Sequence, residues 1–239
     1  SILLSMPSAK GLFHKASVQS GAGLAVGRKE QANEVTRKLL DALKIKPGDS
    51  AALQAVPART LLATAGRLGI GMPGPGGGNP ILDGVAITRD PFTPDAPDES
   101  LDVPVMVGGC KDEWTIFTAS ESWFGTMTEA DLQARVAPLG EPGKALLAAF
   151  RKAYPGYSPT YLWEQMISAR VMQGTTILAE RKAAKGGAPA FVWFLTWETP
   201  TLNGAYKSPH TMEIPFMLYS FDKVRTFVGP GTGPKQMAD

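Results

Sequence analysis

The sequence predicts an α/β protein built on a mostly parallel sheet with helices on both faces. Two short apolar runs, 103–108 and 190–195, contain the β-branched and aromatic residues that strands favour. Segments with helical spacing precede and separate these runs, and such alternation is typical of a parallel sheet covered on both sides. The 239 residues are enough for one large domain with a substantial core.

The segments outside the strand-like runs carry the spacing of amphipathic helices. Four apolar residues of 27–45 share one helical face: Val35, Leu39, Leu40 and Leu43. We expect Ser50 to cap a short helix. Further helices are expected from Pro57 onward and over 129–136, 143–154 and 160–185. A strand-like run over 16–19 comes before all of them and ends at Ser20.

Composition narrows the function classes. The formal charge is only +2, and lysine and arginine alternate with acids, so nothing indicates a nucleic-acid partner. Cys110 is the only cysteine, which excludes a disulfide within the chain. No apolar run reaches the ~20 residues of a membrane-spanning helix. The first residues lack an initiator methionine and a signal-peptide pattern, so we expect part of a longer protein, with its compartment left open.

A pair of carboxylates follows the first apolar run. The run ends in Gly108-Gly109, and Asp112 and Glu113 follow after two intervening residues. This is how an α/β enzyme brings an acid to the carboxyl edge of its sheet, where the acid can hold a histidine. The alternative is a solvated acidic pair at the start of a helix, favoured by the helix dipole.

A histidine follows the second apolar run, which is expected to be a buried strand. The chain has two histidines, and His210 lies where this strand leads into a loop. Its pKa near neutrality and its place at a strand exit indicate an acid–base role. The alternative is a histidine that merely caps the following segment.

Four stretches match, in order, the motifs of one enzyme family: 4–21, 80–84, 108–113 and 210–216. The first resembles the segment directly after the nucleophile of the type-B carboxylesterases, which include the cholinesterases and the bacterial p-nitrobenzyl esterases. The second resembles the family's P-V-x-D-G signature. The third resembles G-x-x-x-D-E, which carries the catalytic acid, and the fourth resembles H-x-x-E-I-P-F, which carries the catalytic histidine.

The resemblance implies part of an α/β-hydrolase fold and a serine carboxylic-ester hydrolase that needs no cofactor. In the implied order of Ser, acid and His, Glu113 is the triad acid and His210 the base. The family's G-x-S-x-G elbow and HGG-type oxyanion loop both lie upstream of the first match. We therefore expect a piece of a single domain, truncated at both ends and inactive by itself. The alternative is a non-catalytic binding or adhesion protein of the same fold.

Ser20 resembles a nucleophile only superficially. It follows a strand-like run, but an elbow needs glycine two residues before and two after the serine, and Val18 and Ala22 stand there. The family comparison instead implies a supporting hydroxyl near the acid and base. Glu213, three residues after His210, is expected to hydrogen-bond locally and orient the loop. A metal site is not expected, because zinc sites show denser ligand clusters.

Aromatic residues after Glu113 are candidates for a substrate pocket. We assign Trp114 and Phe117 to the pocket and leave Trp123 and Phe124 open between pocket and core. Trp114 stands where the family usually has glycine. The irregular stretch 69–78 has neither a Walker A nor a Rossmann pattern. The resemblance implies that it lines an acyl site that is roomy or mobile, and the alternative is a mobile surface loop. A small ester is the implied substrate; its identity and the oligomeric state stay open.

Overall fold

The computed structural model describes residues 1–70 and 79–239, and these form two compact units. The first unit comprises 1–13 and 23–102, and the second comprises 14–22 and 103–239. The expected acyl-side stretch 69–78 lies almost entirely outside the described residues. Each unit is described here by itself.

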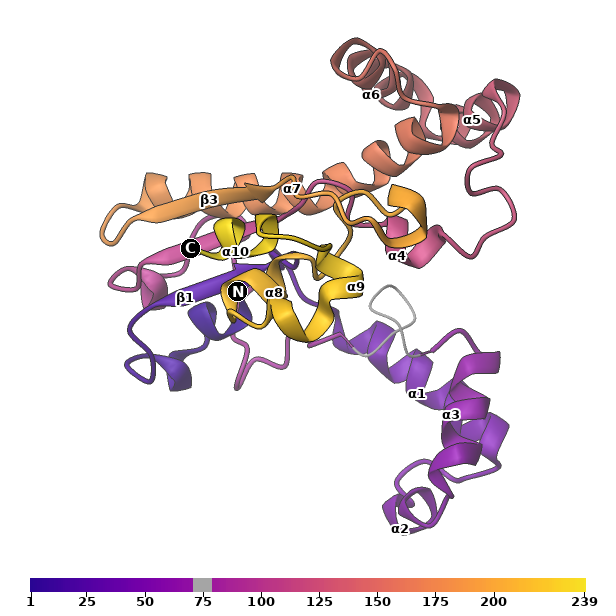
Figure 1. Ribbon diagram of the computed structural model, residues 1–239. Coiled ribbons are helices and arrows are strands. Elements are labelled where there is room, and N and C mark those ends of the chain that lie inside the picture. Colours follow the sequence, from indigo (N-terminus) through magenta and orange to yellow (C-terminus); the bar gives the residue numbers. More distant parts are fainter. Residues whose placement is uncertain (71–78) are drawn as a thin grey trace. The chain divides into compact units, whose positions relative to one another are not determined.

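The second unit contains a parallel sheet of three strands in the order β1-β2-β3 (Figure 1). The strands are β1 (Ala16–Gln19), β2 (Val105–Cys110) and β3 (Ala190–Leu195). In the register, Gln19 of β1 lies beside Gly108 of β2, and Gly108 lies beside Trp193 of β3. The predicted parallel sheet is therefore confirmed.

Strand β2 runs two residues beyond the predicted run and includes Gly108 and Gly109. Neither glycine has room for a side chain: a Cβ on Gly108 would collide with Trp193, and one on Gly109 would meet Glu113 and Val171. The prediction that the run ends at the glycine pair was therefore wrong, because the strand ends at Cys110.

Helices cover both faces of this sheet. Figure 1 shows α7 (Pro159–Lys185) running alongside β3, and α7 packs on both β2 and β3. On the opposite face, Cys110 and Leu195 join a buried cluster with Met212 and Phe216. Adjacent residues of a strand point to opposite faces, so Gly109 faces α7 while Cys110 faces the C-terminal helices.

The other helices of the second unit fall into two groups. Near the start of α7, a cluster of buried side chains unites α5 and α6 with it. Their bounds, with neighbouring short helices, are α4 (Thr115–Thr118), α5 (Glu129–Val136), η4 (Ala137–Leu139) and α6 (Gly140–Ala153). The C-terminal group is η5 (Thr201–Gly204), α8 (Glu213–Met217), η6 (Phe221–Val224), α9 (Arg225–Val228) and α10 (Gly233–Ala238).

The prediction of a buried strand over 190–195 was only partly right. The strand is present with these bounds, but Phe191, Val192 and Phe194 are exposed, and only Leu195 is buried. The physical reason is the strand order: β3 lies at the edge of the three-stranded sheet and pairs on one side only.

The first unit is mainly helical. Its elements are η1 (Ile2–Ser5), η2 (Pro7–Ala9), α1 (Lys29–Leu43), α2 (Ser50–Gln54), α3 (Ala58–Arg67) and η3 (Asp98–Ser100). Helix α2 starts at Ser50, but the cap is Asp49, whose carboxylate accepts the Ala52 N–H at 2.9 Å. The expectation that Ser50 caps it was wrong by one residue. Among all helices of the described segments, none is both long and apolar enough to cross a membrane.

Candidate active site

The carboxyl ends of the three neighbouring strands each deliver one of the predicted residues. Ser20 directly follows β1, and its N–H donates to the Gly108 carbonyl of β2 at 2.8 Å. Glu113 follows β2 by three residues, and His210 lies in the loop after β3. Because parallel strands end at the same edge, residues far apart in sequence meet there.

Glu113 is the centre of this group. Its side chain is 2 % exposed, and Oε2 lies 2.6 Å from His210 Nδ1. Oε1 accepts two further hydrogen bonds, each at 2.6 Å, from the Ser20 hydroxyl and from the Cys110 N–H. Both oxygens of the buried carboxylate are therefore satisfied, as a buried charge requires.

His210 is half-buried and presents Nδ1 to the acid. The hydrogen bond to Glu113 is the main cause that raises the pKa of His210 above its ordinary value, although burial opposes the rise. With Nδ1 engaged, Nε2 is the nitrogen available to another group, and it has no hydrogen-bond partner within the described segments. A neutral imidazole held in this way can accept a proton at Nε2.

Backbone strain surrounds the site. Ser20 and Thr211 have φ values of 52° and 72°, in the left-handed region that residues with side chains rarely adopt. Thr211 is β-branched, for which this conformation is unfavourable, and it directly follows His210. Such conformations persist only where neighbouring structure enforces them, and they cluster at functional sites.

Of the two predicted pocket aromatics, Phe117 lies beside the histidine and Trp114 lies against Phe117. The Phe117 ring centroid is 5.4 Å from that of His210, and Trp114 packs on Phe117 edge to face at 5.6 Å. Both side chains are exposed, at 42 % for Trp114 and 48 % for Phe117. Trp123 instead packs on the helical cluster of α5, α6 and α7. Of the two alternatives given for Trp123, pocket and core, the structure therefore favours the core.

Trp114 fits its backbone position without strain. Its φ of −88° is ordinary for any residue, and its N–H donates to the Ser168 hydroxyl at 3.2 Å. The departure from the family's glycine therefore distorts nothing locally and adds an aromatic surface next to the acid.

Glu213 does not hydrogen-bond locally as expected. It is buried, and its Oε2 accepts the Cys110 thiol at 3.1 Å across 103 residues of sequence. Burial is the main cause that raises the pKa of Cys110 far above its ordinary value, so the thiol stays protonated and acts as the donor. Glu213 therefore ties the start of α8 to the end of β2. In the described residues, no group of three metal-ligating side chains occurs.

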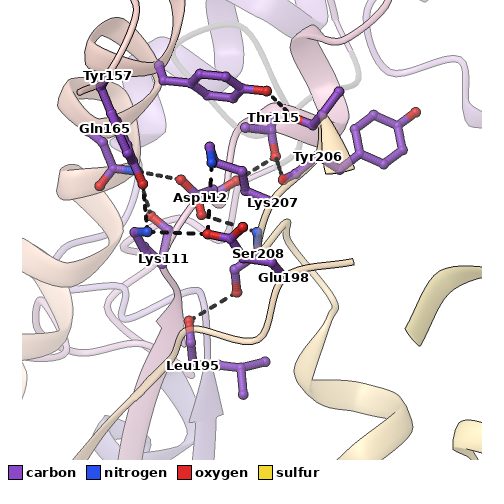
Figure 2. Close-up of polar contacts among 12 residues, drawn as sticks. Lys111, Asp112, Thr115, Tyr157, Gln165, Leu195, Glu198, Tyr206, Lys207 and Ser208 are labelled. Atoms are coloured by element: carbon purple, nitrogen blue, oxygen red, sulfur yellow. Dashed lines mark hydrogen bonds and ion pairs between the residues drawn. The ribbon is translucent and has the colours of Figure 1, made fainter. Parts of the chain in front are cut away.

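Sequence reasoning missed a second polar cluster, which surrounds Asp112 (Figure 2). Asp112 is fully buried and pairs with Gln165 of α7 and with Ser208 of the histidine loop. The adjacent Lys111 donates to the Tyr157 hydroxyl at 2.7 Å. Asp112 was visible only as one of two carboxylates after the strand, and no pattern in the sequence linked it to Gln165 or Ser208.

A sheet with an acid after one parallel strand and a histidine in the loop after the next is the arrangement of an α/β hydrolase. The chain has this fold, as the resemblance implied.

Known carboxylesterases are similar to almost the whole chain, although no family model matches it. It is 28 % identical over 235 residues to the para-nitrobenzyl esterase of Bacillus subtilis, covering 92 % of this chain and 44 % of that protein. A Geobacillus stearothermophilus carboxylesterase structure matches 99 % of this chain and 49 % of its own, with TM-score 0.77 and 30 % identity. A PNB esterase structure matches with TM-score 0.71 at 24 % identity, which supports the fold alone.

These comparisons confirm the resemblance to the type-B carboxylesterases: the chain is a homologue of carboxylesterases. It spans about half the length of the relatives it matches.

Gly109 offers a test of how tightly the acid is held. A methyl group there would lie 2.6 Å from Glu113 Oε1 and 3.0 Å from Val171 Cγ1. We expect Gly109→Ala to displace the carboxylate and, if Glu113 is a catalytic acid, to lower kcat of the full-length protein about 100-fold. Overpacking should also lower the free energy of unfolding by about 1–3 kcal/mol.

Gly66→Ala is the matched control. Gly66 lies inside α3, a Cβ there has nothing within 4 Å, and its φ is not positive. The expected result is unchanged kcat and a gain of up to about 1 kcal/mol in unfolding free energy. Ester-hydrolysis kinetics and urea unfolding measure both effects, and a wild-type kcat in Gly109→Ala would contradict the prediction.

Proposed function

We propose that the full-length protein is a serine carboxylic-ester hydrolase in which Glu113 and His210 are two members of a Ser-Glu-His triad. The observation that carries the proposal is the 2.6 Å contact between Glu113 Oε2 and His210 Nδ1 at the carboxyl edge of a parallel sheet. The similarity to carboxylesterases supports it. Both compact units would belong to one α/β-hydrolase domain.

The nucleophile in this proposal is a serine outside the present chain, on a G-x-S-x-G elbow. Ser20 is unsuited to that role because its hydroxyl donates to Glu113 Oε1, whereas a nucleophile must give its proton to the base. Ser20 would instead fix the orientation of the acid. The oxyanion hole would also come from outside these residues, and each of its donors is typically worth about 3 kcal/mol.

In the first half-reaction the serine oxygen attacks the ester carbonyl, and His210 Nε2 takes the hydroxyl proton. Collapse of the tetrahedral intermediate breaks the ester C–O bond, and His210 returns the proton to the leaving alkoxide. Water then repeats the sequence on the acyl-enzyme, releases the carboxylic acid and restores the serine. Glu113 keeps the Nδ1–H tautomer and stabilises the imidazolium that forms twice in each cycle. This chemistry requires no cofactor.

Trp114 and Phe117 would form an apolar wall for the ester group. Both are exposed, and Phe117 lies against the base. Substrate sites are mostly apolar with a few convergent polar groups, which is the combination seen around His210. The substrate class is therefore a small, uncharged ester.

The test uses the full-length protein with p-nitrophenyl acetate and p-nitrophenyl butyrate, together with a fluorophosphonate probe. We expect hydrolysis of both esters and labelling of one serine, located by peptide mass spectrometry outside the present chain. Labelling of Ser20 would overturn the assignment of the nucleophile. If the protein neither hydrolyses the esters nor reacts with the probe, the result would favour the non-catalytic alternative.

A further inference from the structure

Asp112 is the buried carboxylate next to the proposed acid, and its side-chain hydrogen bonds go to Gln165 and Ser208. It is 0 % exposed. Its Oδ1 accepts the Gln165 side-chain amide at 2.5 Å, and its Oδ2 accepts the Ser208 N–H at 3.1 Å (Figure 2). One carboxylate therefore bridges α7, the end of β2 and the loop that carries His210.

The bridge is reinforced by backbone pairing. The Asp112 N–H donates to the Ser208 carbonyl at 2.8 Å, so the two residues exchange hydrogen bonds in both directions. The Ser208 hydroxyl donates to the Leu195 carbonyl at the end of β3 at 3.1 Å. Two residues later, the His210 N–H donates to the Glu113 carbonyl at 3.3 Å. The histidine loop is thus fastened to the acid loop on both sides of Pro209.

The loop needs such a fastening because its own conformation is unfavourable. Lys207 and Thr211, on either side of Ser208 and His210, have φ values of 52° and 72°. Each residue in this region costs on the order of 1–3 kcal/mol unless surrounding contacts enforce it. Without Asp112, a buried N–H of Ser208 would also lose its acceptor.

Burying a carboxylate here has a cost that a plain packing residue would avoid. Burial is the main cause that raises the pKa of Asp112 to about 6, while the Ser208 N–H and the charges of Lys111 and Lys207 oppose the rise. The charge of Glu198 raises the pKa of Asp112 further. An apolar residue of similar size could fill the space without this penalty, which points to a role in geometry.

We propose that Asp112 is the positioning residue of the histidine loop, which holds Ser208 so that His210 Nδ1 meets Glu113. This inference rests on the proposed function, because positioning matters to a rate only if His210 is the base. Gln165 is the second support, since it fixes the other oxygen of Asp112 from α7.

The experiment compares Asp112→Ala and Asp112→Asn in the full-length protein with a p-nitrophenyl ester. For Asp112→Ala we expect kcat to fall about 100-fold with KM changed less than about threefold, because misplacement of a catalytic group by ~1 Å costs on this scale. Asp112→Asn should recover kcat to within about tenfold of wild type. Its amide oxygen can accept the Ser208 N–H, and Gln165 can rotate to present its own oxygen.

Glu164→Gln is the matched control. Glu164 is another fully buried carboxylate, adjacent to Gln165 on α7, and the hydrogen bond that it accepts comes from the Thr118 hydroxyl at 2.7 Å. The kcat of the Glu164→Gln variant should remain at the wild-type value. An equal loss of kcat in Glu164→Gln and Asp112→Ala would overturn the proposal, because it would show a general effect of removing buried charge.

A spectroscopic measurement separates this proposal from the proposed function. The short Glu113–His210 contact should give a downfield proton NMR signal from Nδ1–H, which Asp112→Ala weakens or shifts while Glu164→Gln preserves it. An unchanged signal in a folded Asp112→Ala variant overturns the positioning role. If His210→Ala hydrolyses esters normally, the proposed function fails, and the signal still tests the positioning.

Should Asp112→Ala fail to fold, Gln165→Met carries the test with both readouts. It preserves side-chain volume and removes the hydrogen bond to Asp112 Oδ1. We expect a loss of about tenfold in kcat and a shift of the same signal. Wild-type kcat together with an unshifted signal would overturn the proposal.

Discussion

His210→Ala in the full-length protein is expected to lower kcat/KM for ester hydrolysis by about 10⁴-fold or more. The variant removes the group proposed to take the serine proton, and it leaves Glu113 Oε2 without its partner at 2.6 Å. Steady-state kinetics with p-nitrophenyl butyrate measure the loss. Near-ultraviolet circular dichroism establishes that the fold is intact.

His14→Ala is the matched control, since the chain has only these two histidines. His14 is exposed and belongs to the same compact unit. The His14→Ala variant should hydrolyse the ester at the wild-type rate. Equal activity of the two variants would contradict the role assigned to His210.

Glu113→Gln is expected to lower kcat about 10³- to 10⁴-fold while the protein stays folded. The glutamine oxygen can still accept from Ser20 and Cys110, which places the amide NH₂ against His210 Nδ1. That contact favours the tautomer with its proton on Nε2, which cannot accept a proton from serine. Glu121→Gln, which removes an exposed carboxylate after α4, should leave kcat unchanged.

The same variant should move the pH dependence in a defined direction. The proposed mechanism requires neutral imidazole at His210, so kcat/KM should rise with pH through the pKa of His210. The hydrogen bond to Glu113 and the charge of Glu113 raise that pKa, whereas burial lowers it. Removing the charge should therefore shift the acid limb of the residual activity to lower pH. Proton NMR titration of the two histidine rings gives an independent value, and an upward shift for His210 would contradict the prediction.

The elements of the fold that could be predicted from the sequence are those marked by the spacing of nearby residues. The strand ahead of Ser20 and the helix over 129–136 have the predicted bounds, because their apolar spacing reflects one face packed on a core. Glu113 and His210 could be paired in advance because each follows a strand of a parallel sheet. The resemblance to a known family then added the order of the triad.

The parts that escaped prediction depend on contacts between distant segments. Nothing near Glu213 indicates that it accepts the thiol of Cys110, and nothing near Asp112 indicates Gln165 and Ser208. The exposure of β3 likewise follows from strand order, which an apolar run does not reveal. Local patterns locate the elements, whereas the hydrogen bonds between them are decided by packing.

The long sequence separations within the site have a consequence for how the protein folds. Ser20 and Glu113 are 93 residues apart, and Glu113 and His210 are 97 residues apart. Closing a flexible loop of about 90 residues costs roughly 4 kcal/mol of chain entropy, which local structure cannot supply. The hydrogen bonds from Ser20 and His210 to Glu113 therefore form only after the three strands have paired. Catalytic competence should be acquired late in refolding, after most of the helical signal has returned.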